Sequence, residues 1–469
     1  MRVQKSRIFF FLMLAVSFAV KSQSSDIRDY NSYLAYIKNN HVLAKQAKNQ
    51  SEIAKRQLAA ARGNYDPKIN SDIQNKYFNS KNYYTVAKAE LKQPIYTSQY
   101  LKLGYEYGQG TFVGPEDLTS QGGLPFLGIE ASLLQGLMFD KRRAEVTKAK
   151  FYKDYYEAES RIQLNDLLLD ASQNYFEYLF VKRVLGLQTF FYNIAIERQK
   201  GIVAMAIQGE RAAVDTIESS IFLQGRLMER LGAETEVIKQ KNELNVFTFN
   251  QETRLPEILN QTDSLDIYYN LATGYLLSNF NRDTLNNPIL IQYAAKSGVL
   301  ETEYRWRREQ IKPKLDVSYN FLSASDRATT LLLNSNNYKW GASLSFPLFF
   351  RNPVNESKIA KLGLKNNQFE LQNKSNQISA KLGYISQSVA LLIDQLSNAE
   401  KSVRYSKQLV EAERVKFFNG ESSLFILNAR ETKWFETELK LLEYKMKLIN
   451  LVLYTIHLRG NLNYELIQK

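Results

Sequence analysis

The sequence predicts a mainly α-helical protein that also carries a small membrane β-barrel. Three observations support this fold class. First, the prolines leave two long gaps, from 126 to 255 and from 354 to 469. A proline inside a helix costs about 3 kcal/mol, so these gaps permit long helices. Second, four short segments alternate apolar and polar side chains, as strands with two different faces do. Third, matched motifs recur in the same order in both halves of the chain.

The N-terminus has the pattern of a secretory signal peptide. Arg2, Lys5 and Arg7 precede an apolar run from 8 to 20. That run is too short to span a bilayer as a helix, so residues 1–22 are predicted to be a signal peptide rather than a buried N-terminal helix. No later run approaches the roughly 18 apolar residues of a membrane helix. Any membrane entry of the mature chain is therefore predicted to use a closed barrel.

Composition excludes several classes of function. The chain has no cysteine, which excludes disulfides, thiolate metal sites and a lipid on an N-terminal cysteine. Its only histidines are His41 and His457, and it has no glycine-rich phosphate loop, metal-ligand spacing or nucleophile elbow. We therefore expect no catalytic residue, no cofactor and no metal, and no enzyme activity. The formal charge of +13 accompanies alternating Lys and Glu along helical stretches, which favours solvated helix faces over nucleic-acid binding.

Four pairs of motifs divide the chain into two structural repeats. The last two pairs share the same offset along the chain, which is hard to obtain by chance. The predicted organisation is a signal peptide at 1–22, a first repeat at 23–262 and a second repeat at 263–469. The matching segments are 39–43 with 286–290, 66–69 with 312–315, 135–139 with 346–350, and 209–210 with 420–421.

Each repeat is predicted to contain one pair of strands, at about 68–80 and 126–136 and at about 314–322 and 338–347. Their length suits tilted strands that cross a membrane. The alternative is a half-buried strand of a soluble sheet, but four strands in a mainly helical chain have no obvious partner sheet. The residues predicted to face lipid are Val317, Tyr319, Phe321, Trp340 and Leu344.

The number of strands predicts an oligomer. Four strands cannot close a barrel alone, since the smallest single-chain membrane barrels have eight. Three protomers would supply twelve, so we expect a homotrimer with four strands per protomer in a 12-stranded barrel. Residues 83–108 also alternate apolar and polar side chains. We expect them to form an extracellular hairpin above the membrane, with an extra strand pair within the barrel as the alternative.

Two helical hairpins are predicted to give the molecule its length. About 73 residues separate Gly136 from Gly209, and the same number separates Pro347 from Gly420, which corresponds to about 110 Å of helix. The chain is predicted to reverse near 209 and 420, at the end of the molecule far from the strands. Helix pairs of this length suit a tube that spans the periplasm.

Three motifs together resemble the TolC-like outer-membrane efflux protein family, also called outer membrane factors. The first is an Asn-Asn-x-x-Leu helix start, followed by a proline before the outgoing strand. The second is the strand end at 346–349 followed by Lys358, Ala360 and Lys361, and the third is the turn at 418–429. The resemblance covers most of the mature chain. It implies a homotrimer whose 12-stranded barrel is continuous with a long periplasmic α-helical barrel.

The same resemblance implies a function and partners. It implies passive transport across the cell outer membrane, through the exit duct of a tripartite efflux system or a type I secretion system. The implied partners are outer-membrane lipid, a periplasmic adaptor (membrane fusion protein) and an inner-membrane RND or ABC transporter, without nucleic acid. Whether small molecules or secreted proteins pass is left open. A periplasmic coiled-coil scaffold or adaptor is the alternative, although adaptors lack paired amphipathic strands in both repeats.

In that family, acidic residues just after the turn glycine line the closed periplasmic aperture. Here Asp215 and Glu218 follow Gly209 and fall on one helical face. Three copies would form an acidic ring that favours cations, whereas the alternative is that both acids complement the helix dipole. In the second repeat, Asn428 stands in the matching region after Gly420. The acidic ring is lost there, and Asn428 is expected to face the pore as a neutral group.

Overall fold

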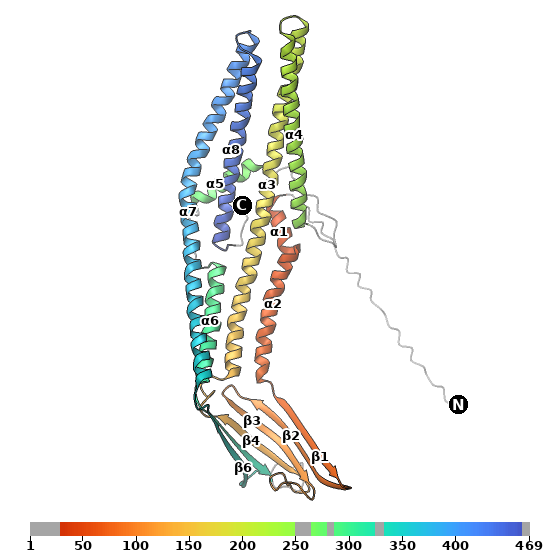
Figure 1. Ribbon diagram of the computed structural model, residues 1–469, viewed down its shortest axis with the longest axis vertical. Coiled ribbons are helices and arrows are strands. Elements are labelled where there is room, and N and C mark those ends of the chain that lie inside the picture. The colour runs from red at the N-terminus through yellow and green to blue at the C-terminus, as the bar shows by residue number, and fades with distance from the viewer. Residues whose placement is uncertain (1–28, 249–263, 279–285, 324–332, 462–469) are drawn as a thin grey trace, which may run out of the picture.

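The computed structural model describes residues 29–248, 264–278, 286–323 and 333–461. The predicted signal peptide at 1–22 lies outside these residues. The molecule is elongated, with a β-sheet at one end and the turns of two helical hairpins at the other (Figure 1). The predicted fold class, mainly helical with a small sheet, is confirmed.

Two very long helices give the molecule its length. α3 (Lys141–Ile207) has 67 residues and α7 (Arg351–Phe418) has 68, so each is about 100 Å long. α2 (Val42–Arg62) packs on α3, and α6 (Pro288–Glu309) packs between α3 and α7. The helices next to the sheet thus form one layer in the order α2, α3, α6, α7. Among the described helices, none has a stretch long and apolar enough to cross a membrane.

Four further helices lie within the described residues. α4 (Ala213–Thr248) returns along α3, and α8 (Leu424–Leu458) returns along α7. The shorter α1 (Tyr30–Asn40) and α5 (Leu265–Ser278) lie about half-way along the molecule (Figure 1). Each long helix and its return helix therefore form one hairpin.

Helix starts follow local sequence signals. Asp29 caps α1 in a capping box with Ser32, and Asn287 caps α6 with Pro288 in the first helical turn. The side chain of Ser423 caps α8. These caps accept hydrogen bonds from backbone N–H groups that have no partner inside the helix. They explain why the helices begin at these residues.

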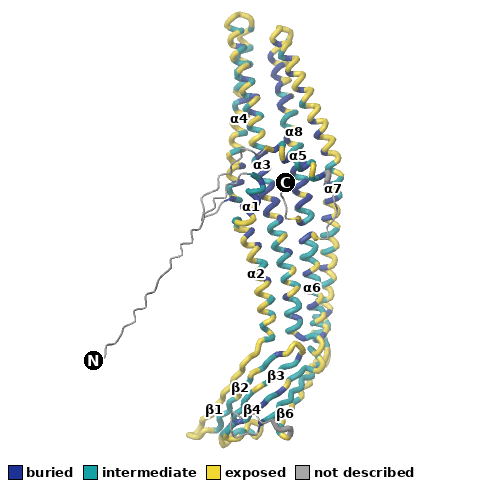
Figure 2. The backbone as a smooth tube through the Cα atoms, turned by 180° about the vertical axis from the view of Figure 1, so that it is seen from behind, coloured by how far each residue is buried: buried dark blue, intermediate teal, exposed yellow. Residues whose placement is uncertain are grey.

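The main hydrophobic core lies at mid-length, where α1, α3, α5 and α8 meet (Figure 2). The ring of Tyr30 in α1 lies 4.8 Å from the ring of Phe176 in α3, and Tyr268 of α5 lies 5.1 Å from the same Phe176 ring. Tyr30 donates a hydrogen bond to Ser172, and burial raises the pKa of its phenol above the ordinary value. Burying each of these rings stabilises the fold by about 1.5–3 kcal/mol, so this core fastens the short helices to the long ones.

The sheet contains six described strands that pair in sequence order, each antiparallel to the next. A short 3-10 turn, η1 (Gly63–Tyr65), connects α2 to the first strand. The strands are β1 (Lys68–Phe78), β2 (Lys81–Pro94), β3 (Gln99–Gln109), β4 (Leu124–Ser132), β5 (Lys314–Ser323) and β6 (Leu333–Ser345).

The prediction of four strands per protomer is therefore wrong. Residues 83–94 lie in β2 and residues 99–108 in β3 of the same sheet, with a turn at 95–98 between them. They do not stand apart from the sheet, so segments 68–80 and 126–136 do not pair with each other. The physical reason is the pairing of β2 and β3 with the strands on either side of them. It places Leu103 between Leu91 and Leu127 on one face, and an apolar face of this kind determines strand register.

Candidate functional site

One face of the sheet is apolar. The registers place Leu91, Leu103, Leu127 and Phe321 side by side across four strands. Because side chains alternate along a strand, residues two positions away share the same face. All five strand residues that the sequence predicted to face lipid belong to it. The apolar sheet face consists of Ile69, Ile73, Leu91, Leu101, Leu103, Tyr105, Tyr107, Leu127, Ile129, Val317, Tyr319, Phe321, Tyr338, Trp340 and Leu344.

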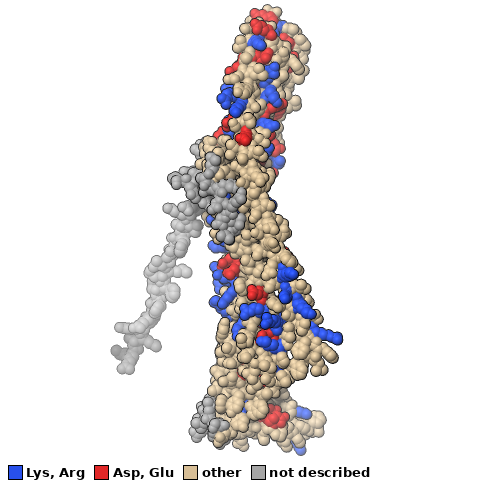
Figure 3. All heavy atoms as spheres, turned by 90° about the vertical axis from the view of Figure 1, so that its left-hand side faces the viewer, with Lys and Arg blue, Asp and Glu red and all other residues tan. Residues whose placement is uncertain are grey.

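Much of the apolar sheet face is exposed in the single chain. Ile69 is 79% exposed, Trp340 65% and Leu344 60%. An exposed apolar surface of this extent marks a contact with lipid or with another protein. Figure 3 shows few charged side chains over the sheet, and Lys and Arg side chains gathered over the helices next to it.

The opposite face of the sheet carries a row of ion pairs. Lysines and glutamates on neighbouring strands occupy the positions between the apolar residues. Across the described ranges, no group of three or more His, Cys, Asp or Glu residues could hold a metal ion. The ion pairs of this polar sheet face are Lys88–Glu106 at 2.6 Å, Lys92–Glu130 at 2.9 Å, Lys314–Asp316 at 2.8 Å, Lys102–Glu90 at 3.9 Å, Lys339–Glu106 at 3.9 Å, and Lys102–Glu130.

Two of these ion pairs indicate that the sheet curls toward its polar face. Lys92 of β2 reaches Glu130 of β4 across β3, at 2.9 Å. Glu106 of β3 comes within 3.9 Å of Lys339 of β6, across both β4 and β5. In a flat sheet these strands are about 10 and 14 Å apart. Side chains converge in this way on the concave side of a sheet, so the polar face is concave and the apolar face convex.

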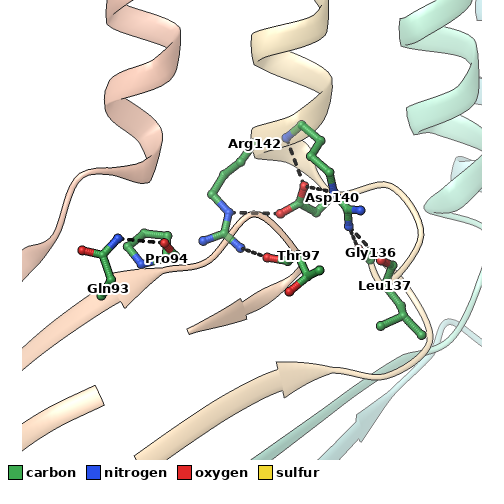
Figure 4. Close-up of polar contacts among 8 residues, drawn as sticks. Gln93, Pro94, Thr97, Gly136, Leu137, Asp140 and Arg142 are labelled. Carbon is green, nitrogen blue, oxygen red and sulfur yellow. Dashed lines mark hydrogen bonds and ion pairs between the residues drawn. The ribbon is translucent and has the colours of Figure 1, made fainter. Parts of the chain in front are cut away.

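A cluster of hydrogen bonds fastens the sheet to α3 (Figure 4). Asp140 caps α3, and its carboxylate accepts from Nε of Arg142 at 3.0 Å and from Nε of Arg143 at 2.9 Å. Arg142 also donates to the carbonyl of Thr97, in the turn between β2 and β3, at 3.2 Å. Arg143 donates to the carbonyl of Gly136, just after β4, at 3.0 Å. The first turn of one helix thus holds the end of β2, the start of β3 and the segment just after β4.

At the other end of the molecule, Gly209 and Gly420 occupy the turns of the two helical hairpins. Their φ angles are 77° and 80°, a region in which residues with a Cβ atom are strained. In each turn the next residue donates its backbone N–H to a carbonyl of the preceding helix, at 3.0 Å for Glu210 and 2.9 Å for Glu421. Both glycines therefore lie where the sequence predicts the chain to reverse.

The two hairpins contact each other at their turns. Arg211 donates to the carbonyl of Phe417 at 2.6 Å, and its guanidinium lies 4.3 Å from the Phe417 ring. Further along, the amide of Asn428 in α8 donates to the carboxylate of Glu218 in α4 at 3.3 Å. Asn428 is 8% exposed, so in the single chain it forms a contact between hairpins rather than a free surface group. Asp215 lies in the first turn of α4 and is half-buried.

A buried ionic cluster joins the hairpins a short distance from their turns. Glu431 of α8 is 1% exposed and pairs with Arg198 of α3 at 2.6 Å. Arg414 of α7 lies 3.7 Å from the other carboxylate oxygen. Arg226 of α4 is also buried and donates to the hydroxyl of Thr432 at 3.2 Å. Since all four helices contribute, the cluster holds one hairpin against the other.

Aromatic rings surround this ionic cluster. The ring of Phe222 lies 4.7 Å from the guanidinium of Arg198 and 5.0 Å from that of Arg226. Burial lowers the pKa of the Arg198 guanidinium, and the Glu431 carboxylate opposes that shift. Sequence reasoning missed the cluster, because single Arg and Glu residues along a long helix have the pattern of a solvated face.

Comparison with known proteins shows similarity in structure. No protein-family model matches the sequence, and no curated protein matches it either. The outer-membrane channel CmeC of Campylobacter jejuni is 14% identical, with a TM-score of 0.63 over 98% of this chain and 94% of that one. The open state of the Neisseria gonorrhoeae outer-membrane channel MtrE is 13% identical, with a TM-score of 0.64 over 93% of this chain and 90% of that one.

A third solved structure gives the same result. The outer-membrane protein VceC of Vibrio cholerae is 13% identical, with a TM-score of 0.64 over 92% of this chain and 95% of that one. These matches extend over nearly the whole length of each chain, so they include both the sheet and the helical hairpins. The chain therefore has the fold of the TolC-like outer-membrane channels that its motifs resemble.

Proposed function

We propose that three copies of this chain form an exit duct through the outer membrane, continued by a helical tunnel in the periplasm. One observation carries the proposal. A curled sheet with an apolar convex face and an ionic concave face stands at the end of helices about 100 Å long. In a closed barrel, the convex face contacts lipid hydrocarbon and the concave face lines water. Val317, Tyr319, Phe321, Trp340 and Leu344 are then lipid-facing.

The free edges of the protomer support a homotrimer. β1 and β6 are the edge strands of the described sheet, and α2 and α7 are the edges of the helical layer. β1 follows α2 in the chain and β6 precedes α7. The edges formed by β1 and α2 therefore lie on one side of the molecule, and the edges formed by β6 and α7 lie on the other (Figure 1). An exposed strand edge invites pairing with another chain. A neighbouring copy would cover the strand edge and the helix edge at the same time.

The proposed role is passive transport, without catalysis and without a cofactor. Such a duct receives its cargo from an inner-membrane RND or ABC transporter through a periplasmic adaptor, as in tripartite efflux or type I secretion. The solved structures of similar fold are outer-membrane channels, which supports this role over that of a periplasmic scaffold or adaptor. The six-stranded sheet also favours the duct, because a coiled-coil scaffold has no use for a sheet with an exposed apolar face.

We also propose that 23–262 and 263–469 are two structural repeats that follow a cleaved signal peptide at 1–22. The long helices have 67 and 68 residues, and the return helices have 36 and 35. The turn glycines adopt nearly the same φ angle. The aperture residues at the two matched turns are Gly209, Asp215, Glu218, Gly420 and Asn428.

The proposed assembly predicts a homotrimer in mild detergent. Light scattering with the detergent contribution subtracted is expected to give three times the mass of the mature protomer. The same preparation is expected to produce stepwise current increases in planar bilayers, because each trimer contains one pore. A monomer or dimer as the only stable species, with no channel activity, would contradict the duct.

The acidic residues near the first turn predict cation preference at the aperture. Replacing Asp215 by Asn and Glu218 by Gln removes up to six charges per trimer while it keeps side-chain size. Since the ring attracts cations, the variant's preference for cations is expected to fall, most clearly at low salt, where screening is weak. Reversal potentials in a salt gradient measure this preference.

A matched control removes the same number of charges away from the turn. Glu234 and Glu236 lie on exposed positions of α4, further from Gly209. Their replacement by Gln is expected to leave the reversal potential unchanged. If the two double variants have the same reversal potential as the wild type, Asp215 and Glu218 only stabilise the helix through its dipole. In that case the aperture variant loses a little thermal stability and nothing else.

A further inference from the structure

We propose that each copy supplies six strands to the barrel, so that the trimer closes with eighteen strands instead of the twelve implied by the family resemblance. This proposal rests on the trimeric duct proposed above. β2 and β3 are then barrel strands of full height, and β1 of one copy pairs with β6 of the next. The proposal follows from four features of the described residues.

The first feature is the position of the turn between β2 and β3. Arg142, in the first turn of α3, donates to the carbonyl of Thr97 in that turn (Figure 4). Its guanidinium also lies 4.3 Å from the ring of Tyr100 at the start of β3. A hairpin that stood above the membrane would lie at the far end of the sheet from α3. The turn is instead anchored at the helical end, so both strands start there and run outward.

The second feature is that β2 and β3 continue both faces of the sheet. On the apolar side, Leu103 lies between Leu91 of β2 and Leu127 of β4. On the polar side, Lys102 pairs with Glu90 of β2 and with Glu130 of β4. A hairpin outside the membrane has water on both faces. In that position, nothing would favour an unbroken row of apolar side chains along one face. β2 and β3 therefore share the surroundings of β4 and β5.

The third feature is strand direction. β1 runs away from the helices, because it follows α2, and β6 runs back toward them, because it leads into α7. Six is an even number, so β6 of one copy and β1 of the next are antiparallel, like every other pair in the sheet. Closure therefore needs no change in pairing pattern, as in other antiparallel membrane barrels.

The fourth feature is the exposure of the edge strand β1. All 11 of its residues are exposed in the single chain, although they alternate apolar and polar side chains for part of their length. Ile73, for example, is 71% exposed and lies opposite Ala87 of β2. Among the described residues, neither the outer edge of β1 nor its apolar side chains have a neighbour beyond β2. Pairing with β6 of another copy supplies both the hydrogen bonds and the continuous apolar face.

Eighteen strands make a wide bore. With strands about 4.8 Å apart and tilted by about 40°, they enclose a backbone diameter of about 36 Å, against about 24 Å for twelve. Barrels of 16–18 strands leave an aqueous channel.

Single cysteines test the strand number, because the chain has no cysteine of its own. Lys88 and Ala89 are neighbours on β2, and the register places Lys88 on the polar face and Ala89 on the apolar face. Trimers of Lys88→Cys and Ala89→Cys are placed in phospholipid vesicles and treated with a water-soluble maleimide. We expect this reagent to label the cysteine at position 88 and not the cysteine at position 89. A lipid-soluble maleimide is expected to label position 89.

Ser343 and Leu344 on β6 provide the reference pair, since β6 belongs to the barrel in the four-strand and the six-strand arrangement alike. If 343 and 344 alternate in labelling while 88 and 89 are both labelled from water, β2 is outside the membrane and the six-strand proposal is overturned, but the duct remains. If 343 and 344 do not alternate, the duct itself is wrong. If Ala89→Cys does not form trimers, Ala87→Cys provides the same test on the same face.

Cross-linking tests the junction between copies. Gln74 of β1 and Ser343 of β6 both lie on the polar face. With cysteine at both positions, a flexible bismaleimide is expected to give covalent dimers and trimers on a denaturing gel, while each single variant gives none. Monomers alone from the double variant, in a preparation whose mass is trimeric, would overturn the pairing of β1 with β6.

Discussion

Arginine at Leu344 is expected to destabilise the assembled barrel by about 2–4 kcal/mol, whereas arginine at the adjacent Ser343 is expected to be tolerated. Leu344 lies on the apolar sheet face, opposite Leu315 of β5, and Ser343 lies on the polar face, opposite Asp316. A guanidinium in hydrocarbon loses its hydration and finds no partner. At position 343 the same group meets water and a carboxylate.

A second matched pair makes this test independent of one strand. Val317 and Ser318 are neighbours on β5, on the apolar and the polar face respectively. Trimer yield in membranes, compared at equal expression for the four arginine variants, measures the effect. Equal losses at both faces would show that the convex face does not contact lipid, and the barrel assignment would then be abandoned.

Replacing Glu431 by Gln is expected to destabilise the helical hairpins by about 3–5 kcal/mol, because Arg198 is left buried without its countercharge. The pair is nearly inaccessible to water, with exposed fractions of 7% for the Arg198 side chain and 2% for that of Glu431. Arg414 lies close by, and Arg226 keeps its own pair with Glu229 at 2.9 Å, so Arg198 would lose the carboxylate that it faces while other guanidinium groups remain near it. Thermal unfolding followed by helical circular dichroism measures the loss.

Two variants control for the change at Glu431. Glu436→Gln removes an exposed acid from the same helix, and it is expected to change stability by less than about 0.5 kcal/mol. The double variant Arg198→Met with Glu431→Leu removes both charges at once. It is expected to recover most of the stability, since apolar side chains of similar volume often replace a buried ion pair without loss. If Glu431→Gln unfolds like the wild type, the pair does not hold the hairpins together.

Local features were predictable from the sequence alone. The first proline-free segment contains α3 and α4, and the second contains α8 and all of α7 except its first turn, because helix formation depends on neighbouring residues and on the absence of helix breakers. Gly209 and Gly420 were identified as turn residues because a tight reversal needs a residue that tolerates positive φ. The five apolar strand residues share one face because the side-chain period of a strand is two.

Pairing between distant segments was decided only by the tertiary structure. Nothing local to Leu101 or Tyr105 distinguishes a strand inside the sheet from a hairpin outside it; the choice depends on which strands lie on either side. The same holds for Glu431, whose sequence neighbours resemble those of a solvated helix, although its partner Arg198 stands more than two hundred residues away. The sequence by itself thus determined the helices, the turns and the two-faced strands, because these depend on residues near in the chain. Strand order, sheet curvature and the buried ion pair depend on contacts between residues far apart in the chain, so only the folded structure decided them.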